Sequence, residues 1–257
     1  MTEQFYRDIA ALQEGAIACL EYTEDVSDLG AWVLAQTAAR AGENILAIGC
    51  DSNEQTISLA RTLGPRGYVL AIDRSYRALT ALCRSSQAGG LEQTIRFLYL
   101  NLDDLGGHLR PEDFDRVLCG RALLHVKQPR AVFQAIRRAL KVGGIFFFYG
   151  PTRKDLMELR LFHAALRHET CESREQFFVE QLGLRHAHDT FAQVDLISFE
   201  SPLCFTSPDA LYIYWRESEL YEEELDRDFR YAAVQHFRSY STFETAQRLV
   251  GVKAING

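Results

Sequence analysis

The amino-acid sequence predicts a doubly wound α/β fold, in which helices cover both faces of a mostly parallel sheet. Five short apolar runs alternate with amphipathic stretches between residues 42 and 150. These runs are continuously apolar, as is typical of strands buried on both faces. Helix-capping and turn residues separate the runs from the amphipathic stretches, so each unit is predicted to be a strand followed by a helix.

The first two units each combine a strand with a capped helix. Asn44 to Ile48 (NILAI) is predicted to be a strand, and Ser52 to Gln55 matches the S-x-x-Q capping box that opens a helix. Gly64 to Gly67 (GPRG) is expected to end this helix. Tyr68 to Ile72 (YVLAI) is the second predicted strand, and Ser75 is placed to cap the next helix.

Three more strands complete the predicted parallel sheet. They cover Ile95 to Leu100, Arg116 to Cys119 and Ile145 to Tyr149. Pro129 stands at a predicted helix start, where the missing amide hydrogen of proline costs no hydrogen bond, and Ala131 to Leu140 continues that helix.

The residues on either side of this core are predicted to be mostly helical. The expected helices are 3–22, 28–40, 153–168, 173–182, one that Ser207 and Pro208 open, and 219–238. Strands are expected at 194–200 and at 243–255, the last of them antiparallel. We therefore expect a single domain over residues 1–257, with N-terminal helices at 1–41, the sheet core at 42–150 and lid helices with the last strands at 151–257.

Composition and charge narrow the class of protein. The 257 residues include 28 Lys and Arg against 35 Asp and Glu, a net charge of −7. Nucleic-acid affinity comes mainly from clustered cations, so no nucleic-acid partner is expected and a small-molecule ligand is favoured. The six cysteines contain no C-x-x-C pair and are expected to be reduced thiols. With no signal-peptide pattern and no apolar stretch long enough to span a membrane, a cytoplasmic protein without a membrane partner is expected.

The candidate ligand site lies where the strands end, because ligands of open parallel sheets bind beyond the carboxyl ends of the strands. Gly49 follows the first strand and permits a tight turn close to a ligand. Asp73 ends the second strand, where an acid is placed to accept hydrogen bonds from both hydroxyls of a ribose. Asn101 and Gly120 follow the third and fourth strands.

These segments resemble the class I methyltransferases that use S-adenosylmethionine, specifically the small-molecule type. The resemblance rests on ILAIGCDSNEQTISLA with GPRGYVLAIDRS, on FDRVLCGRALLHV and on RRALKVGGIFFF. It covers about residues 42 to 150 well, and Val142 replaces the proline of the family's R-x-L-K-P-G-G motif. The resemblance implies a Rossmann-like sheet, S-adenosylmethionine as cofactor, and an enzyme that transfers a methyl group.

The resemblance also implies roles for individual residues. Gly49 and Cys50 would pass close to the methionine half of the cofactor, and Asp73 would hold its ribose. Arg74 would flank the adenine, whose edge Asn101 and the Leu102 backbone would contact. The backbone at Cys119 and Gly120 would face the sulfonium.

The glycine-rich loop departs from the family pattern at three positions. Ala47 stands where the family usually has an acid, and Asp51 and Asn53 replace the second and third glycines. Asn53 is expected to tolerate a left-handed backbone, whereas the Asp51 carboxylate would repel the carboxylate of methionine. These departures keep an alternative open, in which the fold is repurposed for non-methylating chemistry such as cyclisation, or for binding alone.

His125 is the candidate catalytic residue. It follows the fourth strand in the run ALLHV, which places it to act as a general base if the acceptor must lose a proton. The alternative is that its imidazole only forms a hydrogen bond within the loop.

The remaining histidines are not expected to bind a metal. His186 and His188, with Asp189, lack a third ligand at a set spacing and are expected to be surface residues. His163 and His168 stand at i, i+5 on a helix, a poor ligand spacing, and are expected to be structural.

Aromatic residues are concentrated between residues 191 and 243. Tyr212, Tyr214, Trp215 and Tyr221 either line a pocket for an apolar substrate or form the core of the lid, and the lid core is the favoured interpretation. The acidic run 222–224 is expected to be a solvated helix face.

The sequence therefore predicts a metal-free enzyme that transfers a methyl group from S-adenosylmethionine to an O, N or C atom of a small metabolite. A nicotinamide dehydrogenase is disfavoured because G-x-G-x-x-G is absent, and P-loop chemistry is disfavoured because no G-K-[ST] occurs. The oligomeric state does not follow from the sequence.

Overall fold

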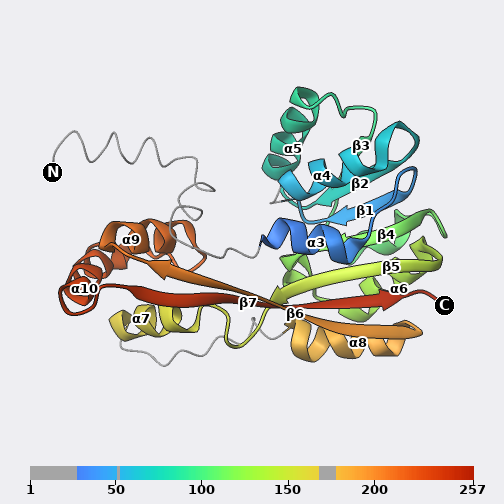
Figure 1. Cartoon of the computed structure of the whole chain (residues 1–257). Helices are drawn as coiled ribbons and strands as arrows, with labels where there is room; N and C mark the ends of the chain where they lie inside the picture. Colours follow the sequence, from blue (N-terminus) through green and yellow to red (C-terminus); the bar gives the residue numbers. More distant parts are fainter. Residues whose placement is uncertain (1–27, 51–52, 168–177) are drawn as a thin grey trace. The chain divides into compact units, whose positions relative to one another are not determined.

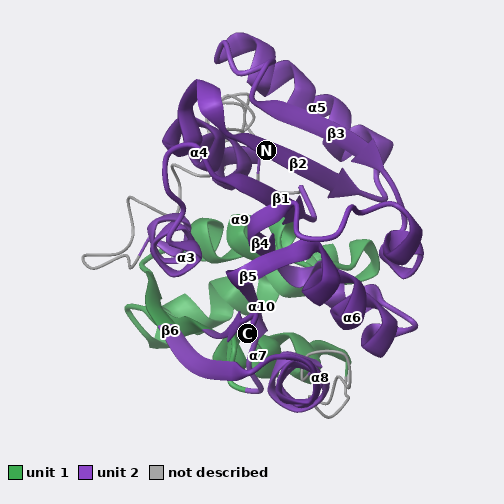
Figure 2. Ribbon diagram, turned by 90° about the vertical axis from the view of Figure 1, so that its right-hand side faces the viewer, with its two compact units in different colours: residues 1–27, 154–173, 200–248 green, residues 28–153, 174–199, 249–257 purple. Residues whose placement is uncertain are grey.

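The computed structural model describes residues 28–50, 53–167 and 178–257 (Figure 1). These residues form two compact units, shown in green and purple in Figure 2. Unit 1 contains the described residues 154–167 and 200–248, and unit 2 contains the rest. The single-domain organisation remains a prediction.

Unit 2 is built on five parallel strands. They are β1 (Asn44–Ile48), β2 (Tyr68–Asp73), β3 (Ile95–Tyr99), β4 (Phe114–Cys119) and β5 (Leu140–Pro151). The sheet order is β3-β2-β1-β4-β5-β7-β6, in which β7 (Phe243–Ile255) runs antiparallel to β5 and β6 (Gln193–Phe205) follows it. The α/β sheet with one antiparallel strand confirms the predicted fold class.

Helices cover both faces of this sheet, as the continuously apolar strands predict. On one face, α3 (Leu29–Thr37), α4 (Asn53–Leu63) and α5 (Tyr76–Ala88) pack against the sheet. On the other face lie α6 (Pro129–Ala139) and α8 (Leu184–Thr190). A π-helix, η5 (Val179–Gly183), directly precedes α8.

Local signals explain where several of these elements begin. The Ser75 hydroxyl accepts a hydrogen bond from the backbone N–H of Ala78 (3.2 Å), and Pro129 is in the first turn of α6. Both observations confirm the predicted helix starts. The predicted cap at Ser52 and the predicted helix at 3–22 lie outside the described residues.

Strand β5 begins five residues earlier than the apolar run predicts. Leu140 pairs with Phe114, and the register then shifts so that Ile145 pairs with Arg116. Gly143, with φ of +74°, lies within this irregular start. Gly143 and Gly144 therefore belong to the strand, because glycine accommodates the irregular backbone.

Unit 1 contains α7 (Met157–Arg167), α9 (Pro208–Glu217), a short 3₁₀ helix (η6, Glu223–Leu225) and α10 (Asp226–Ser239). The helix expected at 219–238 corresponds to α10, which begins at Asp226 rather than at residue 219. The Trp215 ring is fully buried and stacks on Phe229 with ring centroids 4.1 Å apart. Tyr212 and Trp215 therefore form the core of this unit, in agreement with the lid-core interpretation.

Glu222 corrects the prediction of a solvated acidic helix face. It lies before η6, and its carboxylate is 2.6 Å from Arg167 Nη1 and 3.4 Å from His163 Nε2. Glu222 is half-buried, whereas Glu223 and Glu224 are exposed. Sequence alone does not show this pairing because the partners lie more than fifty residues away.

In the part of the chain that the structure describes, no helix has the length and apolar character needed to cross a membrane.

Candidate functional site

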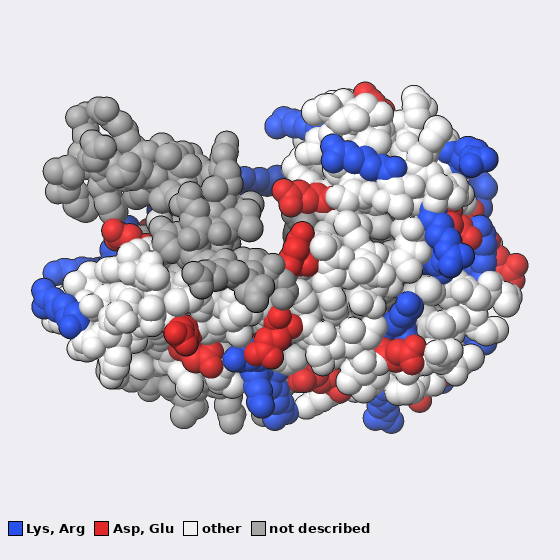
Figure 3. All heavy atoms as spheres, in the orientation of Figure 1, with Lys and Arg blue, Asp and Glu red and all other residues white. Residues whose placement is uncertain are grey.

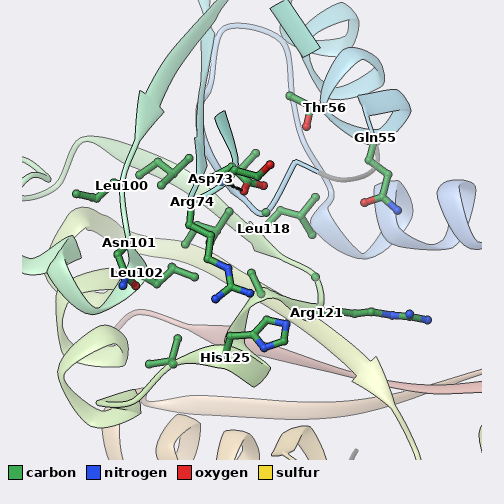
Figure 4. Close-up of a pocket in the computed structure, with 18 of the residues that line it drawn as sticks. Gln55, Thr56, Asp73, Arg74, Leu100, Asn101, Leu102, Leu118, Arg121 and His125 are labelled. Carbon is green, nitrogen blue, oxygen red and sulfur yellow. Dashed lines mark hydrogen bonds between the residues drawn. The ribbon is translucent and has the colours of Figure 1, made fainter. Parts of the chain in front are cut away.

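A cavity of about 710 Å³ lies within unit 2 at the carboxyl ends of the parallel strands (Figure 4). It is lined from the ends of β1, β2, β4 and β5, from α4, and from the 3₁₀ helices η2 (Leu102–Gly107) and η3 (Arg121–His125). Its volume is in the range of about 300–1,000 Å³ that is typical of small-molecule sites.

Most of the sequence-predicted site residues line this cavity. They are Gly49, Asp73, Arg74, Asn101, Leu102, Gly120 and His125. Cys50 and Cys119 do not line it, because both are fully buried in the two core clusters on either face of the sheet. Burial raises the pKa of the Cys119 thiol far above its ordinary value, so this thiol stays protonated and unreactive.

Gly49 forms the turn that leads from β1 into the cavity wall. Its φ is +82°, a left-handed conformation that L side chains rarely adopt, and its backbone N–H donates to the carbonyl oxygen of Ile72 (2.9 Å). A Cβ atom at this position would lie 3.0 Å from the Cβ of Ala122. Glycine therefore satisfies both the backbone conformation and the narrow space.

Asp73 is held in position by backbone hydrogen bonds. Its Oδ2 accepts from the N–H of Cys50 and its Oδ1 from the N–H of Ser75, both at 2.7 Å, and the residue is 8% exposed. Each carboxylate oxygen has further acceptor capacity after one hydrogen bond. The carboxylate is thus fixed at the cavity wall with lone pairs that remain to accept from ligand hydroxyls.

The loop after β3 is fixed by two polar side chains. Asn101 Oδ1 accepts from the N–H of Asp103 (3.2 Å), which leaves the Asn101 amide nitrogen as a donor toward a ligand. The Asp103 carboxylate accepts from the N–H groups of Lys127 (3.0 Å) and Gln128 (2.9 Å). This connection holds η2 beside the start of α6, and with it one end of the cavity.

Gln55, Arg121 and Tyr149 are among the polar residues that line the cavity and were not selected as site residues from the sequence. Gln55 in the first turn of α4 lies 3.2 Å from the Tyr149 hydroxyl, and Arg121 is the first residue of η3. Burial raises the pKa of the Tyr149 hydroxyl above its ordinary value, so it stays protonated. A sequence signal for Tyr149 exists, since it ends the apolar run IFFFY and therefore stands at the carboxyl end of a predicted strand.

His125 and Arg74 both face the cavity. In Figure 4 the imidazole of His125 and the guanidinium of Arg74 point toward one another across the lower part of the cavity. His125 ends η3 and is exposed, so its ring is accessible to a ligand.

Two of the three residues at which the glycine-rich loop departs from the family pattern lie in the described part of the chain. Ala47 is in β1, lines the cavity and is nearly fully buried. Asn53 is the first residue of α4. Asp51 lies outside the described residues.

The other histidines have structural surroundings where the structure describes them. His186, on α8, packs against Phe133 with ring centroids 5.7 Å apart. His163 is buried in unit 1, and His168 lies outside the described residues. Residues 28–50, 53–167 and 178–257 contain no group of three or more His, Cys, Asp or Glu that could hold a metal ion.

Residues 46–148 match the family model described as the methyltransferase domain. Among curated proteins, the chain is 32% identical over 117 residues to a ubiquinone biosynthesis O-methyltransferase from Paraburkholderia phytofirmans, covering 46% of this chain and 47% of that protein. The chain thus spans about half the length of the curated relatives it matches.

Solved structures share the fold over most of the chain. A methyltransferase structure described as putative, from Bacillus halodurans, has a TM-score of 0.61 at 14% identity and covers 90% of this chain and 99% of that one. A [4+2]-cyclase has a TM-score of 0.54 at 17% identity, covering 92% and 87%. These solved structures show that the fold is shared. The family match of residues 46–148 agrees with the resemblance of this segment to class I methyltransferases, which use S-adenosylmethionine.

The residues of the cavity fit this cofactor. Gly49 provides a cradle that a Cβ would fill, and Asp73 presents a fixed carboxylate for ribose hydroxyls. A Cβ at Gly120 would lie 3.2 Å from the Tyr149 hydroxyl, so glycine also keeps the wall open at the end of β4. Asn101 adds a polar group on the side where the adenine is expected.

Proposed function

We propose that this protein is an S-adenosylmethionine-dependent methyltransferase that acts on an O, N or C atom of a small molecule. The observation that carries the proposal is Asp73, which lies at the end of β2 and lines the cavity beside the Gly49 turn. Cavity size, the acid at this strand end and the family match of residues 46–148 all support the same ligand class.

The chain's own residues bind and orient the reactants in this proposal. Asp73 accepts hydrogen bonds from the ribose, Asn101 and Leu102 contact the adenine edge, and Arg74 flanks the ring. The Gly49 turn borders the methionine half, and Gly120 borders the reacting carbon. Each hydrogen bond to the Asp73 carboxylate is worth about 1.5–3 kcal/mol.

When bound, the cofactor supplies a methyl group that its sulfonium makes electrophilic. The protein therefore needs no covalent nucleophile and only has to align the acceptor and exclude water. His125 takes up the acceptor's proton where the acceptor has one to lose.

A small-molecule substrate agrees with the surface charge. On the face drawn in Figure 3, acidic and basic side chains of the described residues of unit 2 are interspersed rather than sorted into separate patches. Nucleic-acid binding depends on clustered cations. The mixed charge on this face supports a small-molecule acceptor.

A second candidate is non-methylating chemistry on the same fold. Ala47 in the cavity wall departs from the family's usual acid, and the fold is shared with a [4+2]-cyclase. In this candidate the cofactor is kept as a structural ligand or lost.

Calorimetry with S-adenosylhomocysteine tests cofactor binding. We expect the wild type to bind, and Asp73→Asn to lose at least tenfold in affinity, because an amide accepts hydrogen bonds less strongly than a carboxylate. Asp104→Asn is the matched control: it removes the same charge from an exposed site in η2 that does not line the cavity, and should change the affinity less than twofold. No heat at millimolar ligand would overturn the proposal.

A further inference from the structure

The cavity has two chemically different ends. In Figure 4, Asn101 and Leu102 lie toward one side, whereas Gln55 and Arg121 lie toward the other. The first end holds the residues proposed to contact the adenine. The second end joins three elements, since Gln55 is on α4, Arg121 on η3 and Tyr149 on β5. No role is assigned to it by the proposed cofactor contacts.

The second end is rich in hydrogen-bond donors. The Gln55 amide and the Tyr149 hydroxyl are 3.2 Å apart and together carry three donor hydrogens, of which their mutual hydrogen bond uses one. Burial keeps the Tyr149 hydroxyl protonated. Arg121 lines the cavity on the same side as Gln55 (Figure 4).

The described residues that line the cavity include more positive than negative side chains. Among its described lining residues, the cations Arg74, Arg121 and Lys127 outnumber the carboxylates Asp73 and Asp103. Both carboxylates already accept backbone N–H groups. Bound S-adenosylmethionine adds a further net positive charge, so an acceptor that brings a negative charge is attracted to this cavity.

From this arrangement we infer that Gln55, Tyr149 and Arg121 form an acceptor subsite for an oxyanion, either a carboxylate or an ionised phenol, whose oxygen takes the methyl group. This inference rests on the proposed methyltransferase function and specifies its substrate class. Arg121 binds the anion by charge, and the Gln55 and Tyr149 donors orient it.

The chemistry balances without a general base. A lone pair of the oxyanion forms the new O–C bond, and the electrons of the breaking C–S bond stay on sulfur, which becomes a neutral thioether. A carboxylate, or a phenol that is already ionised, releases no proton in this step. A phenol that is neutral in solution gives its proton to the solvent when it binds. The negative charge of the acceptor and the positive charge of the sulfonium disappear together, which weakens the attraction of both products to the cavity.

The first experiment separates this subsite from the cofactor site. S-adenosylhomocysteine affinity is measured by calorimetry for the wild type, Arg121→Gln and Arg130→Gln, which removes the same charge from an exposed position outside the cavity lining. We expect all three affinities to agree within twofold. A tenfold loss in Arg121→Gln alone would mean that Arg121 binds the cofactor's own carboxylate, and would overturn the inference. Failure of the wild type to bind would instead overturn the proposed function.

The second experiment tests the acceptor. A small-molecule extract is separated on an anion exchanger at pH 7.5 and at pH 10, and each fraction is assayed for methyl transfer from methyl-labelled S-adenosylmethionine. We expect acceptor activity in the retained fraction: a carboxylate is retained at both pH values, whereas a weakly acidic phenol is retained only at pH 10. Acceptor activity that flows through at both pH values would overturn the inference. Absence of acceptor activity in every fraction, with S-adenosylhomocysteine still bound, would overturn both the inference and methyl transfer.

Steady-state kinetics with the acceptor from the retained fraction then test which residues bind it. We expect Arg121→Gln to raise KM for the acceptor at least tenfold, Arg121→Lys to recover part of that loss, and Tyr149→Phe to raise KM about threefold. The Arg130→Gln control should match the wild type. An unchanged KM in Arg121→Gln would show that the acceptor's charge is recognised elsewhere, against the inference.

Discussion

Gly49 is the residue at which backbone conformation and cavity shape depend most directly on each other. Its φ of +82° turns the chain at the end of β1, and its missing side chain leaves room beside Ala122. Gly64 offers a comparison within the same chain, because its φ of +63° is also left-handed but a Cβ there would meet nothing within 4 Å.

Substitution by alanine should separate the two contributions. We expect Gly64→Ala to lower the free energy of unfolding by about 1 kcal/mol, through backbone strain alone. Gly49→Ala should cost about 2–3 kcal/mol, because strain adds to the crowding against Ala122, and should also weaken S-adenosylhomocysteine binding. Urea unfolding and calorimetry measure both effects. Equal costs at the two positions would show that the contact with Ala122 relaxes freely.

The Asp73 carboxylate has a structural role in addition to its proposed ligand role. It accepts the backbone N–H groups of Cys50 and Ser75, so it joins the ends of β1 and β2. Asp73→Ala would leave both donors without that acceptor and should lower the free energy of unfolding by about 2–4 kcal/mol. Asp73→Asn, which keeps an acceptor oxygen, should cost less than half as much. A smaller loss in Asp73→Ala than in Asp73→Asn by urea unfolding would contradict this role.

At the scale of elements, a half-buried tyrosine connects two strands at the end of the sheet opposite the cavity. The hydroxyl of Tyr68, the first residue of β2, donates to the carboxylate of Asp113 next to β4 (2.9 Å). Burial, followed by the hydrogen bond to Asp113, raises the pKa of Tyr68 to about 12. The folded state thus favours the protonated hydroxyl more strongly than the unfolded chain does.

This connection should weaken in alkali. Because the pKa rises from 10.0 in the unfolded chain to about 12 in the folded protein, its contribution is complete below pH 10 and is lost as the pH rises toward 12. Tyr68→Phe keeps the ring under Arg96, whose guanidinium lies 3.9 Å from the ring centroid, and removes only the hydroxyl. We expect the difference in urea midpoint between wild type and Tyr68→Phe to shrink between pH 9 and pH 11. A difference in urea midpoint that stays constant over this pH range would contradict the stabilising role of the Tyr68 hydroxyl.

The sequence predicted helices and strands well where neighbouring residues determine their bounds. It predicted them less well where the bounds depend on pairing with a distant segment. Apolar runs located all five parallel strands, and the Ser75 cap formed as expected. The early start of β5 depends on pairing between Leu140 and Phe114, which no local pattern encodes. For the same reason the strand-end rule found Asp73 but missed Gln55, whose place in the cavity depends on the Tyr149 hydroxyl across the sheet.

At the scale of the whole molecule, each compact unit contains one of the two tryptophans. Trp32 packs against Phe147 in unit 2, and Trp215 stacks on Phe229 in unit 1. Each indole therefore reports on its own core. The Trp215 indole N–H donates to His163 Nδ1 (3.2 Å), which requires the Nδ1 atom to be unprotonated.

This hydrogen bond makes the stability of unit 1 depend on pH in the acid range. Burial is the main cause that lowers the pKa of His163 from its ordinary value of 6.5, and the nearby Glu222 opposes it. A lowered pKa in the folded state means that stability is complete above pH 6.5 and falls as the pH drops below it, because the unfolded chain takes up the proton first.

Trp215 fluorescence in a Trp32→Phe background tests this dependence. We expect the urea midpoint of unit 1 to fall between pH 7.5 and pH 5.5, and His163→Gln in the same background to remove most of this slope. Gln can accept from Trp215 at every pH in this range. The reciprocal variant, Trp215→Phe, lets Trp32 report whether unit 2 follows the same pH profile. In the described structure, the indole N–H of Trp215 donates to His163. If the urea midpoint changes with pH equally in the presence and absence of His163, another group causes the acid sensitivity.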